Sequence, residues 1–105
     1  MKKIKISIPR KKVLDFCRRW KVDEFSLFGS VLRDDFQPES DIDVLVTFSP
    51  DTQYGLFDLV EMEDELKKLF GRDVDMVEKE AIIQSKNYIR RKNILENTEV
   101  IYAAG

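Results

Sequence analysis

The feature that most constrains the fold of this chain is a run of β-branched and apolar residues near its middle. Residues 42–48 read IDVLVTF, and a nearly continuous apolar run of this kind is typical of a central strand that is buried on both faces. Such a strand is enclosed when helices pack over a small sheet. The chain has 105 residues, a length that suits one domain spanning residues 1–105.

Helical and extended patterns alternate along the rest of the chain. We expect helices at 9–20, 56–70 and 82–95, a helical turn at 30–34, and strands at 24–28, 42–48, 73–77 and 98–103. The helix at 56–70 has the clearest pattern, because its apolar residues recur at helical spacing and Gly71 follows as a C-terminal stop. The predicted fold class is α+β, with a small mixed sheet and helices packed on it.

Composition excludes several kinds of chemistry. The chain has no histidine, which excludes a Ser-His-Asp triad, a histidine-ligated zinc ion and a histidine general base. Its single cysteine, Cys17, cannot form an internal disulfide and aligns with Val13, Leu14 and Trp20 at helical spacing. We therefore expect Cys17 to be a core residue rather than a nucleophile, in a protein of the reducing cytosol.

The sequence contains neither a membrane-spanning pattern nor a signal-peptide pattern. No apolar run approaches the ~20 residues of a membrane span, and the N-terminal segment lacks the apolar stretch of a signal peptide. We expect a cytoplasmic protein without membrane contact.

Residues 1–22 hold nine basic residues and one acid, a balance that could attract nucleic acid. We favour a solvated helix face that balances the acidic remainder, and we expect no nucleic-acid partner.

Two aspartates flank the first residue of the central strand. Asp41 and Asp43 lie two residues apart, so in a strand they point to one face, roughly 6.6 Å apart along the chain. Carboxylates placed in this way repel one another unless a cation lies between them, and Mg²⁺ takes such ligands together with phosphate oxygens. In two-metal sites the ions are about 3.5–4 Å apart, a separation that this pair could bracket. Alone, however, the pattern is weak, because most such pairs are solvated surface residues.

The turn after the strand at 24–28 adds phosphate-binding groups. Gly29 lets a ligand approach the backbone, and the free N–H groups of a helical turn can bind phosphate together with the Ser30 hydroxyl. The same turn could be an ordinary serine N-cap. Arg33 follows one turn later, where its planar guanidinium could bind phosphate or pair with a nearby aspartate.

A third carboxylate lies in the strand predicted at 73–77. Asp75 lies between Val74 and Met76, and it could meet the other two aspartates if the two strands are neighbours. Asp73 shares its face and is the rival candidate. We prefer Asp75, because Asp73 lies at the edge of the strand, where a solvated residue is expected.

Together these residues resemble the signature of the minimal nucleotidyltransferases, in the DNA polymerase β superfamily. That signature is Gly-Ser, ten residues and Asp-x-Asp, and here Gly29-Ser30 is followed by residues 31–40 and then Asp41-Ile42-Asp43. The family's third carboxylate lies in a strand like residues 74–77, and the C-terminal YIRRKNILENTEVIYA is similar to the way these proteins end. The resemblance covers nearly the whole chain. One departure is Asp34-Asp35, where many relatives carry a glycine soon after the arginine.

The resemblance implies the minimal, single-domain form of the nucleotidyltransferase fold. It also implies an enzyme that transfers a nucleoside monophosphate from a nucleoside triphosphate to a hydroxyl group. The Gly29-Ser30 turn would hold the β- and γ-phosphates. Asp41 and Asp43 would bind two Mg²⁺ ions, and Asp75 would complete one metal site and help to deprotonate the acceptor.

A partner protein is implied as well. Larger superfamily members add a domain for the acceptor, and only 30 residues follow Asp75. Minimal members are typically encoded beside a small helical HEPN ribonuclease, a toxin whose tyrosine receives AMP. Our hypothesis is therefore an Mg²⁺-dependent adenylyltransferase that uses ATP and acts as an antitoxin. The alternative is a non-catalytic module that neutralises its partner by occlusion. Nucleotide preference and association between two copies stay open.

Overall fold

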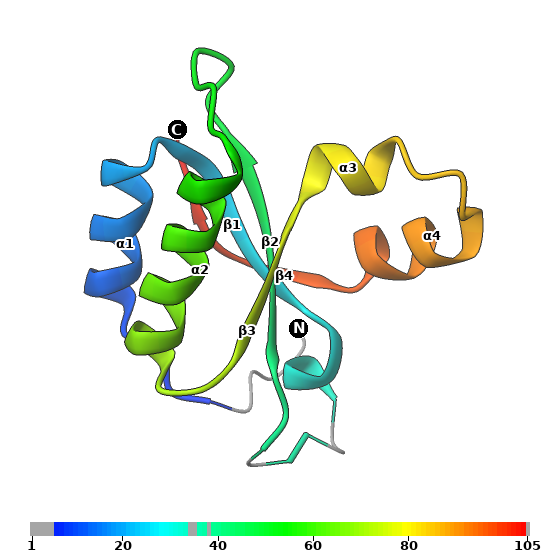
Figure 1. The fold of residues 1–105 in the computed structure, drawn as a ribbon. Coiled ribbons are helices and arrows are strands. Elements are labelled where there is room, and N and C mark those ends of the chain that lie inside the picture. Colours follow the sequence, from blue (N-terminus) through cyan, green and yellow to red (C-terminus); the bar gives the residue numbers. More distant parts are fainter. Residues whose placement is uncertain (1–5, 34–35, 38, 105) are drawn as a thin grey trace.

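The computed structural model describes residues 6–33, 36–37 and 39–104 (Figure 1). In chain order the elements are α1 (Arg10–Arg19), β1 (Val22–Phe28), the 3-10 turn η1 (Gly29–Leu32), β2 (Ile42–Phe48), α2 (Leu56–Phe70), β3 (Val74–Glu78), α3 (Lys79–Ile83), α4 (Tyr88–Glu96) and β4 (Thr98–Ala103). None of the helices in the described ranges is both long and apolar enough to span a membrane.

The strands form one mixed sheet in the order β3-β2-β1-β4. Strand β1 runs antiparallel to both β2 and β4, whereas β2 and β3 are parallel. The α+β class predicted from the sequence is therefore confirmed. Strand β2 has neighbours on both edges, as its apolar sequence indicates. At its start, the Ile42 N–H donates to the Asp73 carbonyl at 2.9 Å, which fixes the beginning of β2 beside that of β3.

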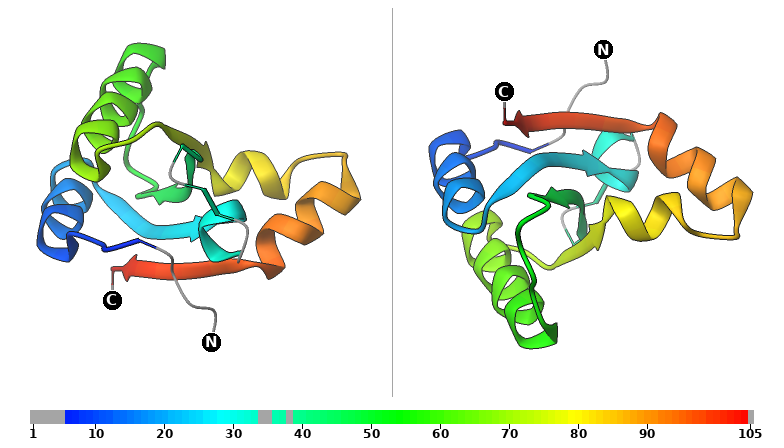
Figure 2. Two further views of the ribbon diagram at one scale, coloured as in Figure 1. Left: turned by 90° about the horizontal axis from the view of Figure 1, so that it is seen from below. Right: turned by 90° about the horizontal axis from the view of Figure 1, so that it is seen from above.

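Helices cover both faces of the sheet. In Figures 1 and 2, α1 and α2 lie on one side and the α3–α4 pair lies on the other. On the first side, Val44 and Val46 belong to a large core that includes residues from both helices. On the second side, Leu45 packs with Phe28, Ile82 and Ile94 in a smaller cluster. Burial on both faces of β2 confirms the prediction from its sequence.

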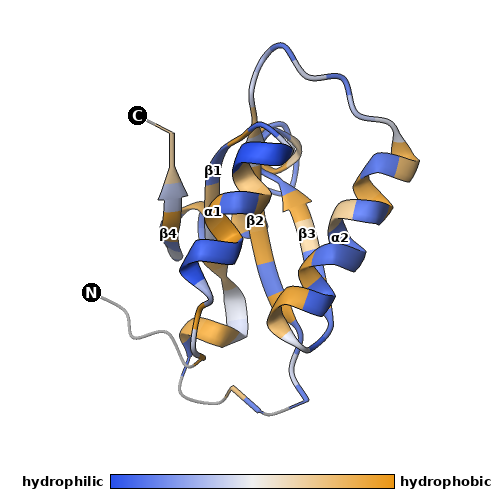
Figure 3. Cartoon of the chain, turned by 90° about the vertical axis from the view of Figure 1, so that its left-hand side faces the viewer, coloured by the Kyte–Doolittle hydropathy of each residue, from blue (hydrophilic) through white to orange (hydrophobic). Residues whose placement is uncertain are grey.

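Helices α1 and α2 lie next to each other over the sheet (Figure 3) and are joined by polar contacts. The indole N–H of Trp20 donates to Glu65 at 2.9 Å, and Arg19 also binds Glu65. Arg19 pairs in addition with Asp15 at 3.1 Å, so acids neutralise part of the basic N-terminal helix. Cys17 on the inner face of α1 is 1% exposed, which confirms it as a core residue.

The predicted helix at 82–95 is wrong, because the chain forms two shorter helices there. Helix α3 ends at Ile83, and α4 begins at Tyr88. Between them the Ser85 hydroxyl accepts from the Asn87 N–H at 3.2 Å, and the Asn87 side chain accepts from the Arg90 N–H at 3.1 Å. These local bonds compete with helix continuation and cap a new helix.

The other boundaries differ little from the prediction. Strand β1 begins two residues earlier than expected, and β3 covers residues 74–78 rather than 73–77. Helix α2 covers the predicted residues, and Gly71 ends it in the left-handed conformation with φ of 72°. Asp34 and Asp35 lie outside the described residues.

Candidate active site

Asp43 lies at the centre of the candidate site, as the second residue of β2. Its partners across the sheet are Phe28 on β1 and Asp75 on β3. Paired residues on adjacent strands project to the same face. Leu45, two residues further on, also shares this face and packs against α3 and α4. The carboxylates of Asp43 and Asp75 are therefore neighbours on the side of the sheet that carries the α3–α4 pair.

The end of β1 is fitted closely to Asp43. Gly29 has a φ of +76°, a conformation that L side chains rarely adopt. A Cβ at this position would overlap the Asp43 carboxylate and lie 3.2 Å from its Cγ. The absence of a side chain at Gly29 therefore permits both the sharp turn into η1 and the close approach of Asp43. The sequence suggested that a ligand would approach this glycine, and in the structure an acidic side chain does so.

A cleft of about 880 Å³ opens in front of these residues. This volume lies within the range of roughly 300–1,000 Å³ that is typical of small-molecule sites. Its floor contains Asp43 and Asp75, and one wall comes from Gly29, Leu32 and Arg33. The opposite wall comes from α4 and the residues that flank it.

The environment of Asp43 disfavours its charged form. Burial raises the pKa of this carboxyl above its usual range, and the negative charges of Asp75 and Asp41 raise it further. The positive charge of Arg33 opposes this rise in the pKa. Asp43 is therefore a partly desolvated carboxylate with two acidic neighbours, an arrangement that a bound cation would relieve.

The donor set fits Mg²⁺, although the described residues contain no group of three acidic or cysteine side chains placed to hold a metal ion. Mg²⁺ usually binds through one or two carboxylates, and substrate phosphates and water complete its shell. Asp43 and Asp75 supply two such oxygen ligands on adjacent strands. The protein residues therefore suit a metal that binds together with a phosphate-bearing substrate.

The structure brings four of the six predicted site residues into this cleft: Gly29, Arg33, Asp43 and Asp75. Asp41 is not among the lining residues. It precedes the first residue of β2 and is exposed, so the alternation of a strand does not fix its side chain. It nevertheless remains close enough to influence the pKa of Asp43.

Ser30 does not line the cleft either. It lies inside η1, where its carbonyl accepts from the Arg33 N–H at 2.9 Å. The residue at the N-cap position is Phe28, and no side chain caps the turn. The alternative of a serine N-cap is therefore wrong. Asp73, the rival of Asp75, precedes β3 and is likewise absent from the lining of the cleft.

Sequence reasoning missed the wall formed around α4. This wall consists of Asn87, Ile89, Arg90, Asn93, Ile94 and Asn97. The available signal was the recurrence of asparagine or arginine every three or four residues from 87 to 97, which places polar side chains on one helix face. That pattern shows a polar face, but not what the face borders.

A family model described as a nucleotidyltransferase domain matches residues 10–101. The chain belongs to this family, and the protein is a nucleotidyltransferase. The resemblance inferred from the Gly-Ser and Asp-x-Asp motifs is thus confirmed. Because the match spans nearly the whole chain, it includes both walls and the floor of the cleft.

Comparisons with individual proteins agree with this assignment. A Methanocaldococcus jannaschii protein, provisionally named a protein adenylyltransferase, is 40% identical over 87 residues, which cover 83% of this chain and 82% of the relative. A solved structure provisionally described as a minimal nucleotidyltransferase has a TM-score of 0.65 at 29% identity and covers 86% of each chain. A tri-AMPylated Shewanella oneidensis HEPN toxin in complex with an MNT antitoxin gives a TM-score of 0.60 at 20% identity, over 90% of this chain and 70% of that one. At that identity the likeness concerns the fold alone.

Proposed function

We propose that this nucleotidyltransferase transfers AMP from ATP to a hydroxyl group of a partner protein and thereby acts as the antitoxin of a HEPN-type toxin. The observation that carries the proposal is the contact between Gly29 and Asp43, beside Asp75, in a cleft of nucleotide size. The similarity to a protein adenylyltransferase supports a protein acceptor. The likeness in fold to an antitoxin held with its AMPylated toxin suggests the kind of partner.

In the proposed reaction, an oxygen of the acceptor attacks the α-phosphorus of ATP. The bond from this phosphorus to the oxygen that leads to the β-phosphate breaks, and pyrophosphate leaves. Asp43 and Asp75 would hold Mg²⁺ with Asp41 nearby, and the bound metal would neutralise charge on the phosphates. Asp75 takes the proton of the acceptor hydroxyl, because it is the more exposed of the two carboxylates on the cleft floor.

The remaining residues of the cleft orient the triphosphate. Gly29 lines the cleft, and its lack of a side chain lets the Asp43 carboxylate lie against the turn. Arg33 lines the same wall and supplies positive charge near the leaving pyrophosphate. Restraining the α-phosphorus in line with the acceptor and the leaving group is the main contribution of a protein to such a transfer.

Transfer of label from ATP tests this proposal. The chain is incubated with Mg²⁺, a small helical protein encoded by a neighbouring gene, and ATP labelled at either the α- or the γ-phosphate. We expect the partner to acquire the α-label only, and Asp43→Asn and Asp75→Asn to abolish the transfer. Asp73→Asn is the matched control, because this exposed acid lies close in sequence but outside the lining of the cleft. A tight complex that silences the partner without any label would instead support occlusion and refute catalysis.

A further inference from the structure

We propose that the cleft face of α4 holds the nucleoside part of the donor nucleotide, with Arg90 and Asn93 as its polar ligands. This inference deepens the proposed function and rests on it. Both residues line the cleft, on the wall opposite η1. They lie three residues apart, nearly one turn of the helix, so their side chains project from the same face.

The side chains of Arg90 and Asn93 differ from those of Asn87 and Asn97, the two asparagines that flank them on this wall, in having no hydrogen-bond partner among the described residues. Neither side chain forms a hydrogen bond or ion pair with any other part of the chain that the structure describes. Asn87, in contrast, caps α4 through its side chain, and the side-chain amide of Asn97 donates to the backbone carbonyl of Asn93 at 2.8 Å. Arg90 and Asn93 therefore present free hydrogen-bonding groups to the cleft.

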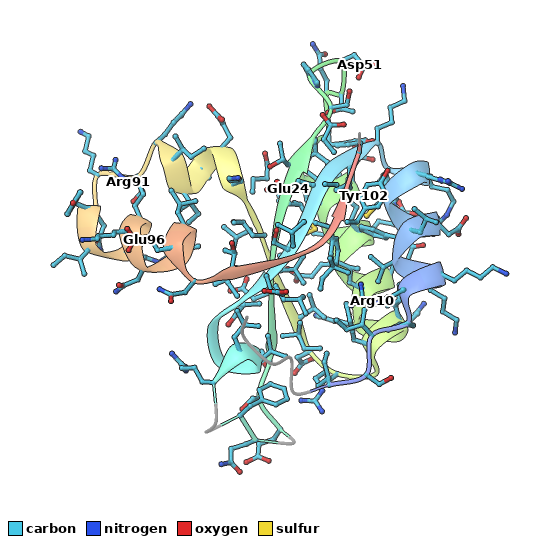
Figure 4. All side chains as sticks on the ribbon, turned by 180° about the vertical axis from the view of Figure 1, so that it is seen from behind. Arg10, Glu24, Asp51, Arg91, Glu96 and Tyr102 are labelled. Atoms are coloured by element: carbon cyan, nitrogen blue, oxygen red, sulfur yellow. The ribbon has the colours of Figure 1, made fainter. Side chains whose placement is uncertain are left out.

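Arg91, the residue next to Arg90, has a structural role in α4. The guanidinium of Arg91 donates to the carbonyl of Ser85 at 3.1 Å and lies 5.5 Å from the centre of the Tyr88 ring. Arg91 belongs to α4 and is labelled in Figure 4 near the segment that joins α3 to α4. It thus holds the connection between the two helices. Arg90 makes none of these contacts and lines the cleft instead.

The distribution of charge separates the two ends of the cleft. The positive charge of Arg33, directly after η1, acts on the Asp43 carboxyl, whereas Arg90 lines the cleft from α4. The metal and the phosphates of a nucleotide belong at the carboxylates, beside Arg33. The nucleoside is joined to the α-phosphate and must then extend toward the remaining wall, which is α4.

The chemistry of this wall suits a purine base. A guanidinium stacks on an aromatic face, and an asparagine amide can pair with the donor and acceptor on the edge of adenine. Ile89, which is 72% exposed, and Leu32 on the facing wall supply apolar surface. A base between them would bury part of this surface.

Calorimetric binding with two probes tests the inference. One probe is a non-hydrolysable ATP analogue with Mg²⁺, and the other is inorganic tripolyphosphate with Mg²⁺. We expect Arg90→Ala to weaken binding of the analogue about tenfold and Asn93→Ala about fivefold. Binding of tripolyphosphate stays unchanged in both variants. Arg90→Lys keeps the charge but loses the planar group, so it also weakens binding of the analogue alone.

Lys92→Ala is the matched control, since it removes a positive charge from the same helix outside the cleft. This variant should bind both probes as the wild type does. Unchanged binding of the analogue by the Arg90 and Asn93 variants would overturn the inference and leave adenylyl transfer intact. An equal loss for tripolyphosphate would also overturn it, because α4 would then bind phosphate. A wild-type chain that binds neither probe would refute the inference and the proposed function together.

Discussion

Replacing Gly29 with alanine perturbs both the backbone and the candidate site, and the structure allows the two effects to be separated. The backbone cost arises because an L-residue at φ of +76° is strained by about 1–2 kcal/mol. For a domain near this size, 1 kcal/mol corresponds to roughly 4–8 °C in melting temperature. We therefore expect the variant to fold and to melt about 5–15 °C below the wild type.

The effect on activity comes from Asp43. The new methyl group overlaps the Asp43 carboxylate, which must rotate away, although the backbone of β2 can remain in place. A displacement of about 1 Å at a reacting centre can reduce the rate about a hundredfold. We expect a loss of this order in adenylyl transfer, and weaker binding of the ATP analogue with Mg²⁺.

Gly71→Ala supplies a matched control. Gly71 has nearly the same φ, 72°, but a Cβ there meets nothing within 4 Å. It should therefore lose a similar amount of stability and retain transfer. Circular dichroism measures the melting temperatures, and transfer is compared at 15 °C below each midpoint. Equal transfer by the two variants would refute the argument that the fit between Gly29 and Asp43 positions the carboxylate.

Asp43→Asn should raise the melting temperature of the metal-free protein at pH 7. Because the pKa of Asp43 is raised in the fold, the wild type loses stability as the pH rises through that pKa, so this gain shrinks as the pH falls toward 3.8. Thermal scans at several pH values that show a constant gain would contradict it. Cys17 should resist a thiol reagent at pH 8 until the protein unfolds, because burial raises its pKa to about 12; rapid labelling of native protein would place it outside the core. Glu65→Ala should lower the free energy of unfolding by about 1 kcal/mol in urea titrations, because Trp20 loses its acceptor; an unchanged midpoint would show that this bond does not join α1 to α2.

Local patterns in the sequence predict the scaffold well. The apolar run of β2 and the amphipathic sequence of α2 each carry their signal within a single element. The break between α3 and α4 was missed, because Ser85 and Asn87 are compatible with a helix by composition. Their hydrogen bonds to nearby N–H groups favour a break, and this competition is not visible in hydrophobic periodicity.

The candidate site, like the fold, could be predicted from the sequence only in part. The spacing of Gly29, Asp43 and Asp75 is sufficient to suggest one site, because two adjacent strands and a turn bring them together. The period-two argument did not extend to Asp41, since β2 begins one residue later. The wall formed by α4 cannot be predicted from a local sequence pattern. It depends on how the chain returns from β3 to β4, which no short motif encodes.

The two faces of the sheet explain why the cleft lies where it does. The face covered by α1 and α2 contains the large core, and a cavity there would remove many packing contacts. On the other face, a smaller cluster around Leu45 and Ile94 and an ion pair between Lys79 and Glu24 join the α3–α4 pair to the sheet. Asp43 lies next to this smaller cluster, so its carboxylate is partly desolvated yet open to the cleft. Regions with few buried contacts are the ones that adjust when a ligand binds. The fold thus keeps the acidic floor on rigid strands and places the more adaptable wall, α4, beside it.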